Sequence, residues 1–147
     1  MNIFHWDEIL ESGDPEIDAQ HRDLFQEANR LHESIMAGKG PEVITSIGCS
    51  IHRDAVHHFG VEERLMRSLQ YPGLEDHIED HRKFSDLLEG MVASGQKMTP
   101  LQIIQVFNSL IRDHILEVDL PMIRWVRMRR SPTFLGETVA SALNPDF

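Results

Sequence analysis

Apolar residues recur at helical spacing along most of the chain, and glycine and proline residues break this pattern into four segments. The pattern predicts helices over residues 17–37, 41–69, 74–91 and 100–118. Gly38, Pro72 and Gly95 lie between these segments, where each would stop a helix. Pro100 suits a first helical turn, and Thr99 before it is a preferred N-cap residue. No strand-like alternation interrupts the helices.

Four amphipathic helices joined by short connections favour an all-α fold, the up-down-up-down antiparallel four-helix bundle. We expect the bundle to span residues 17–122. Residues 1–16 would form an ordered N-terminal arm, because Phe4 and Trp6 can pack against the bundle. Residues 123–147 would form a short C-terminal extension. A chain of 147 residues suits one such domain with a single core.

Seven polar residues fall on the apolar stripes of the four helices. They are His21, His58, Glu62, His77, His81, His114 and Asp119. Residues four apart on an α-helix differ by about 40° and lie about 6 Å apart along the axis, so such a pair can share one metal ion. His58 and Glu62 form one pair at this spacing. His77 and His81 form another.

His114 and Asp119 are five residues apart, which places them on either side of the stripe centre of an α-helix. Their helix would therefore reach two metal ions. Burying all these polar groups is costly unless they are paired, and metal cations would satisfy them together. Imidazole with carboxylate suits iron, and also manganese or zinc.

The other polar residues of interest match no such position. We expect the remaining histidines on the surface or in packing contacts: His5, His32, His52 and His57. Glu63 lies off the apolar stripe, on a face where solvated side chains are expected. The single cysteine, Cys49, excludes an internal disulfide framework, and we expect it to be a small core residue.

The charge and composition of the chain limit the classes of partner that it can bind. The formal net charge of -10 disfavours nucleic acid and anionic membrane surfaces. One local basic cluster is interpreted as a solvated face, and it contains Arg124, Arg127, Arg129 and Arg130. The sequence shows no signal peptide and no apolar run long enough to cross a bilayer, so a soluble cytoplasmic protein is expected.

The spacing of these residues resembles that of the hemerythrins, especially the bacterial single-domain form. The resemblance covers about residues 3–122. It rests on the segment Ile17-Asp18-Ala19-Gln20-His21, on His58-Phe59-x-x-Glu62-Glu63-x-x-Met66, on Tyr71-Pro72, on His77-x-x-x-His81 and on His114-Ile115-x-x-x-Asp119. Spacings within and between these segments make the match specific.

The resemblance implies two non-haem iron ions with an oxo or hydroxo bridge. One iron would be held by His77, His81 and His114, and the other by His21 and His58. Glu62 and Asp119 would bridge the two ions, and the two-histidine iron would keep an open position for dioxygen. The residues expected near the oxygen pocket are Leu24, Leu110, Ile111 and Ile115.

The chain departs from the family pattern near this site. Leu110 stands where the family often has tryptophan, and Met122 stands where it often has an aromatic residue. Pro121 lacks a backbone donor and its ring crowds the carbonyl of Glu117, so we expect the last helix to bend or end soon after Asp119.

Three functions remain as hypotheses. The first is reversible dioxygen binding for storage, delivery or sensing, without enzyme activity, in which a separate protein partner would receive the oxygen or the signal. The second is a di-iron redox enzyme that reduces nitric oxide or peroxide, or oxidises a small substrate. The third is iron storage or iron sensing, which seven fixed ligands disfavour because a closed site exchanges metal slowly.

Overall fold

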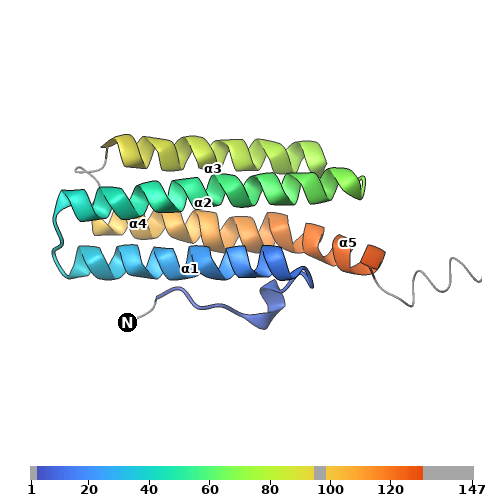
Figure 1. The fold of residues 1–147 in the computed structure, drawn as a ribbon, viewed down its shortest axis with the longest axis horizontal. Helices are drawn as coiled ribbons and strands as arrows, with labels where there is room; N and C mark the ends of the chain where they lie inside the picture. The colour runs from blue at the N-terminus through green and yellow to red at the C-terminus, as the bar shows by residue number, and fades with distance from the viewer. Residues whose placement is uncertain (1–2, 95–98, 131–147) are drawn as a thin grey trace, which may run out of the picture.

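The structure is a computed structural model that describes residues 3–94 and 99–130, and within these ranges the chain forms helices and no strand (Figure 1). The short 3-10 helix η1 (Glu8–Leu10) precedes the long helices. The bundle consists of α1 (Pro15–Met36), α2 (Pro41–Ser68), α3 (Leu74–Ser94) and a fourth rod made of α4 (Pro100–Phe107), η2 (Asn108–Asp119) and α5 (Leu120–Arg130).

Contacts between helices close the bundle. Helix α1 packs on α2 and on α4, α2 packs on α3, and α3 packs on η2. Successive rods run in opposite directions (Figure 1). The predicted up-down-up-down four-helix bundle is therefore confirmed. No helix within the described ranges combines the length and the apolar character that a membrane span requires.

Side-chain caps fix where two of the helices begin. Thr99 accepts a hydrogen bond from the backbone N–H of Gln102, whose side chain accepts one from the Thr99 backbone in return. This capping box confirms the predicted helix start. Helix α1 begins at Pro15, earlier than expected, because the Asp14 side chain accepts hydrogen bonds from the backbone N–H groups of Glu16 and Ile17.

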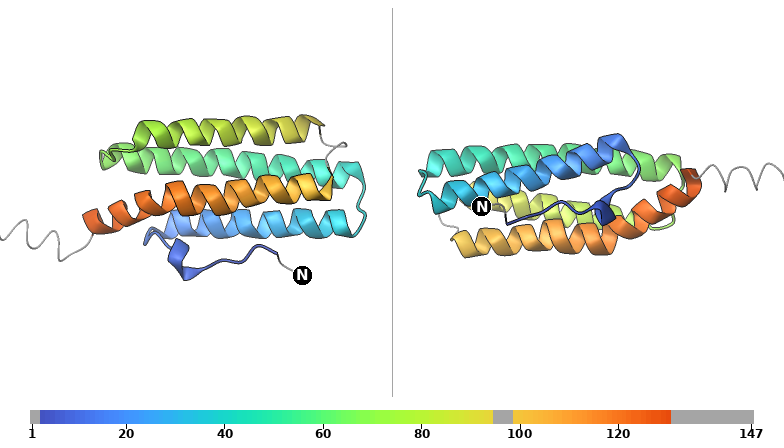
Figure 2. Two further views of the ribbon diagram at one scale, coloured as in Figure 1. Left: turned by 180° about the vertical axis from the view of Figure 1, so that it is seen from behind. Right: turned by 90° about the horizontal axis from the view of Figure 1, so that it is seen from below.

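The fourth rod contains a π-helical segment, η2, which ends at Asp119, two residues before Pro121. The Leu120 backbone N–H donates to the carbonyl of Ile115, five residues back. The rod bends where α5 follows η2, as the right-hand view of Figure 2 shows. The expected bend therefore occurs, but the helix does not end near Asp119 and continues to Arg130. The wider π turns loosen the α-helical hydrogen-bond ladder before the proline, so the ring fits without ending the rod.

The N-terminal arm is ordered over its described residues, as expected. The backbone N–H groups of Ile3 and Phe4 donate to Asn29 Oδ1, each at 2.9 Å, and Asn29 Nδ2 donates to the Phe4 carbonyl at 2.8 Å. Closer to α1, the Ser12 backbone N–H and hydroxyl donate to Asp18 Oδ1 at 2.8 and 2.9 Å. The arm is thus attached to α1 near both of its ends (Figure 2).

The core divides into two apolar parts with a polar layer between them. Along α2, Ala55 belongs to the larger cluster and Met66 to the smaller one, and Glu62 lies between them. Along the fourth rod, Ile115 belongs to the larger cluster and Met122 to the smaller one, and Asp119 lies between them. Cys49 is exposed, so its predicted core position is wrong. It lies about 200° around α2 from the buried Ile47, on the opposite face.

Candidate metal centre

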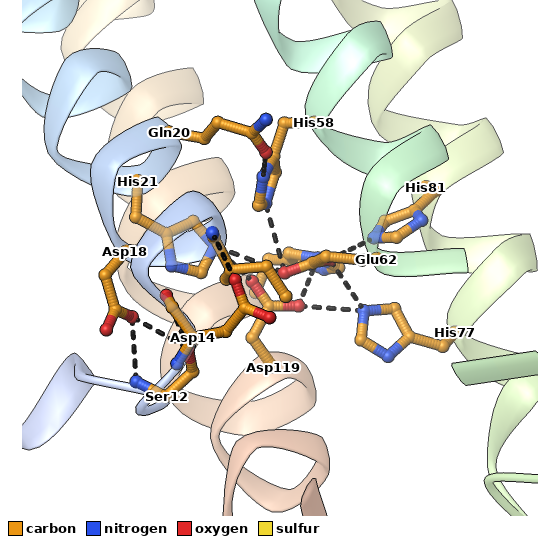
Figure 3. Close-up of polar contacts among 12 residues, drawn as sticks. Ser12, Asp14, Asp18, Gln20, His21, His58, Glu62, His77, His81 and Asp119 are labelled. Carbon is orange, nitrogen blue, oxygen red and sulfur yellow. Dashed lines mark hydrogen bonds and ion pairs between the residues drawn. The ribbon is translucent and has the colours of Figure 1, made fainter. Parts of the chain in front are cut away.

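The polar layer consists of the seven residues that the sequence placed on the apolar stripes. Helix α1 contributes one histidine, α2 a histidine and a carboxylate, α3 two histidines, and η2 a histidine and a carboxylate. Their side chains converge between the helices, and Figure 3 labels six of them. All seven are buried, at 4% exposure or less: His21, His58, Glu62, His77, His81, His114 and Asp119.

The ligand atoms form two groups that share both carboxylates. The five-donor group contains Glu62, His77, His81, His114 and Asp119, and the four-donor group contains His21, His58, Glu62 and Asp119. Within each group, the candidate ligand atoms lie within 4.8 Å of one another. Each group is therefore compact enough to surround one metal ion.

The Glu62 carboxylate spans the two groups with separate oxygens. Oε1 lies 3.1 Å from His58 Nε2 and 3.3 Å from His21 Nε2, on the four-donor side. Oε2 lies 3.0 Å from His81 Nε2 and 3.5 Å from His77 Nε2, on the five-donor side. This division of oxygens is the arrangement that a bridging carboxylate needs.

Asp119 divides its oxygens in the same way. Oδ2 lies 3.3 Å from His21 Nε2 on the four-donor side. Oδ1 lies 2.8 Å from His77 Nε2 and 3.0 Å from His114 Nε2 on the five-donor side. The π turns of η2 explain how His114 and Asp119 meet. A π turn closes between residues five apart, so these two face the same side, whereas an α-helix would separate them by about 140°.

Several buried polar atoms in this layer have no hydrogen-bond partner. Five of these atoms face the centre of the layer, and they are His21 Nε2, His58 Nε2, His114 Nε2, Glu62 Oε1 and Asp119 Oδ2. A buried polar atom without a partner costs about 1–3 kcal/mol, so a native site with five of them calls for an explanation. Cations between the two carboxylates would satisfy all of these atoms, and the nitrogen and oxygen donor set fits iron.

Electrostatics within the layer favour positive charge. Burial alone lowers the pKa of His21, but the carboxylates of Asp119 and Glu62, each 3.3 Å from Nε2, outweigh it and raise the pKa to about 10. The same opposing effects raise the pKa of His77 to about 9.

The remaining shifts fit this picture. Burial lowers the pKa of His58. Burial would raise the pKa of both carboxyl groups, yet the surrounding histidines lower it well below the usual range for Glu62 and for Asp119. Both carboxylates are therefore ionised, and they attract either protons on histidines or metal cations.

Two further residues contact the outer nitrogens of the histidines. His81 Nδ1 lies 2.9 Å from Glu63 Oε1, and His58 Nδ1 lies 2.9 Å from Gln20 Oε1. The predicted solvated position of Glu63 is wrong, because its side chain is only 22% exposed and bonds to His81. Sequence analysis missed these roles. The sequence did offer one indication of these roles, namely their position. Gln20 directly precedes His21 and Glu63 directly follows Glu62, so each lies about 100° around its helix from a buried residue, toward the neighbouring rod.

A small cavity opens on the four-donor side of the centre. Its volume is about 20 Å³, and His21, His58, His114 and Asp119 form its polar wall. The rest of the lining is apolar: Leu24, Ala55, Phe59, Phe107, Leu110 and Ile115. Three of the four residues expected at an oxygen pocket thus line this cavity. The fourth, Ile111, has a side chain outside the described part of the structure.

The remaining histidines lie away from the polar layer. His5 and His57 are exposed, and His32 and His52 are half-buried. None of them joins a metal-capable group among the described residues. The four arginines of the basic cluster in α5 are exposed, and Arg130 pairs with Asp14 at 2.9 Å.

Comparisons with known proteins agree with this geometry. The family model "Hemerythrin HHE cation binding domain" matches residues 12–126. A bacteriohemerythrin from Clostridium acetobutylicum is 27% identical over 125 residues, which cover 80% of this chain and 96% of the relative. A bacteriohemerythrin from Campylobacter jejuni is 23% identical over 111 residues, covering 76% and 83%. A myohemerythrin from Theromyzon tessulatum is 28% identical over 90 residues, covering 61% and 69%. The family match spans most of the chain and includes every residue of the polar layer, and the chain therefore belongs to the hemerythrin family.

Proposed function

We propose that the chain binds dioxygen reversibly at a non-haem di-iron centre. Hemerythrins are oxygen-binding proteins rather than enzymes, and the polar layer has the donor set that such a centre requires. The observation that carries the proposal is an asymmetry. Both histidines of the four-donor group line the cavity, whereas His114 is the only one of the three five-donor histidines that does.

In this proposal His77, His81 and His114 would hold one iron and His21 and His58 the other. Glu62 and Asp119, with an oxo or hydroxo group, would be shared between the two ions. The four-donor group offers fewer protein donors to its metal, and it lies on the side of the centre where the cavity would admit a small ligand. When bound, the iron pair supplies dioxygen with two electrons, one from each ion. The chain fixes the donors on four packed helices, so they need little rearrangement when metal or dioxygen binds.

The cavity suits a small neutral ligand. Its apolar walls disfavour ions, and about 20 Å³ accommodates little more than one water-sized molecule. Organic substrates are too large for this space, which disfavours an oxidase for them. Burial of all seven donors disfavours rapid exchange of metal with solution, so iron storage is also a weaker candidate.

The deciding measurement is the optical spectrum of anaerobically iron-loaded protein, recorded before oxygen, after oxygen and after oxygen is withdrawn. We expect a visible band that appears with oxygen and vanishes on its removal. A band that decays irreversibly, or that never forms, would contradict reversible binding. Steady turnover of nitric oxide or peroxide with a reductant would instead identify a redox enzyme.

A further inference from the structure

The two histidines with outer partners have a defined tautomer. Glu63 Oε1 and Gln20 Oε1 are acceptors, so His81 and His58 must each donate an Nδ1–H to them. In the metal-free protein His81 Nε2 shares a proton with Glu62 and His58 Nε2 faces the same carboxylate, and when a metal ion binds between them the lone pair of each ring would lie on Nε2. Both Nε2 atoms point to Glu62, at 3.0 Å for His81 and 3.1 Å for His58. The outer hydrogen bonds would thus orient each Nε2 lone pair toward a bound metal ion, and Figure 3 shows His58 between Gln20 and Glu62 in this way.

These outer partners differ in charge. Glu63 is an anionic carboxylate on the five-donor side, and Gln20 is a neutral amide on the four-donor side. The Nδ1 atoms of His21, His77 and His114 have no hydrogen-bond partner among the described residues. The outer support of the centre is therefore limited to one charged and one neutral contact, one on each side.

The Glu63 charge acts mainly on His81. Its side chain is 22% exposed, so water screens it only in part. Within residues 3–94 and 99–130, no lysine or arginine forms an ion pair with it. A carboxylate attracts the Nδ1 proton more strongly than an amide does, which makes the imidazole a better electron donor at Nε2.

We propose that Glu63 and Gln20 are positioning residues that make electron donation to the two metal ions unequal. Glu63 strengthens His81 as a donor in the five-donor group, and Gln20 leaves His58 a weaker donor beside the cavity. The five-donor ion is therefore held more tightly and stabilised in its oxidised state. This inference rests on the proposed function, because it requires that both groups hold metal.

Glu63→Gln tests the inference, since it keeps the side-chain shape and removes the charge. The expected results are a loss of affinity for one of the two bound ions of about 10- to 100-fold, measured with Co²⁺ against a chelator, and a more positive reduction potential of the iron-loaded protein. Glu79→Gln is the matched control. It removes the same charge from α3 at a side chain that is 47% exposed and that, among the described residues, forms an ion pair with Arg82 alone.

Gln20→Glu is the reciprocal variant, and it should shift the reduction potential in the negative direction. If Glu63 and Gln20 had a purely structural role, Glu63→Gln and Gln20→Glu would both bind metal more weakly, and their reduction potentials would not shift in opposite directions. Potential and affinity in Glu63→Gln equal to those of Glu79→Gln would overturn the inference. If the unmodified protein does not bind two ions, the proposed function fails instead, and the two failures are therefore distinguishable.

Discussion

At the scale of single residues, burial separates neighbours of the same type. His57 and His58 are adjacent in sequence, but the first is exposed and the second is 1% exposed and faces Glu62. Glu62 is likewise fully buried at 0% exposure, whereas the neighbouring Glu63 is half-buried. Sequence periodicity predicted the inner member of each pair, because it reports which face of a helix is buried. It missed the hydrogen bond of Glu63, since that contact depends on how closely α3 approaches the flank of α2.

The adjacent histidines give a matched test of the ligand assignment. His58→Ala should reduce the metal content from two ions to one and abolish the oxygen-dependent band, because the four-donor group then keeps one histidine. His57→Ala should leave both unchanged. Metal analysis with the optical spectrum measures the outcome. Equal metal content in the two variants would remove His58 from the ligand set.

The cavity gives a second residue-scale prediction. Leu24→Ala enlarges it and should admit water, which speeds oxidation of the iron pair by at least several-fold, and it should cost about 2–5 kcal/mol in the free energy of unfolding. Leu31→Ala removes a buried leucine of the same helix that does not line the cavity. This control should lose similar stability with no change in the oxidation rate measured by absorbance.

At the scale of elements, the outer end of the N-terminal arm is held to α1 by the side chain of Asn29. Asn29 is 6% exposed and makes all three of the hydrogen bonds that hold Ile3 and Phe4. The arm places the Trp6 ring edge-on against Phe25, with centroids 5.6 Å apart, and 6.2 Å from His21. The arm is thus the covering layer outside a proposed metal ligand.

Asn29→Ala should release this layer. We expect a loss of about 1–3 kcal/mol in the free energy of unfolding, because three backbone groups lose their partner. Trp6 should become more accessible to a fluorescence quencher. Gln26→Ala, at an exposed position of α1, serves as the control and should change neither quantity. Unchanged quenching in Asn29→Ala would show that other contacts hold the arm.

The elements also show where sequence reasoning ends. Stripes, Pro100 and the Thr99 cap predicted the helices and their order, since these signals are local. The π-helical segment was not predicted. Spacing of five between His114 and Asp119 looked like two sides of an α-helix, whereas the π turn brings both onto one side, with Nε2 and Oδ1 3.0 Å apart. That geometry depends on packing along the whole rod and on Pro121.

At the scale of the whole molecule, metal-free protein should have a distinctive pH dependence. The raised pKa values of His21 and His77 contribute stability that is fully present below their usual 6.5 and is lost as pH rises through about 9 and 10. The lowered pKa values of Glu62 and Asp119 contribute stability that is present above their usual 4.5 and 3.8 and is lost as pH falls further.

Chelator-treated protein should therefore unfold more easily as pH rises from about 6.5 to 10, as measured by chemical denaturation. The lowered pKa of His58 makes the folded protein less stable as pH falls below the usual value of 6.5. It therefore narrows the pH range in which the metal-free protein is most stable. Metal-loaded protein should lack the loss at high pH, because metal replaces the protons. An equal loss in both forms would place the responsible groups outside the polar layer.

The raised pKa values of His21 and His77 also bear on how the protein matures. Near neutral pH these rings hold protons that partly balance the buried carboxylates, so the bundle need not wait for iron in order to fold. Iron that enters the site would then replace the protons on these histidines inside an already folded bundle. Each chain would release protons to its surroundings in this exchange, so acidification of the medium would weaken the binding of iron.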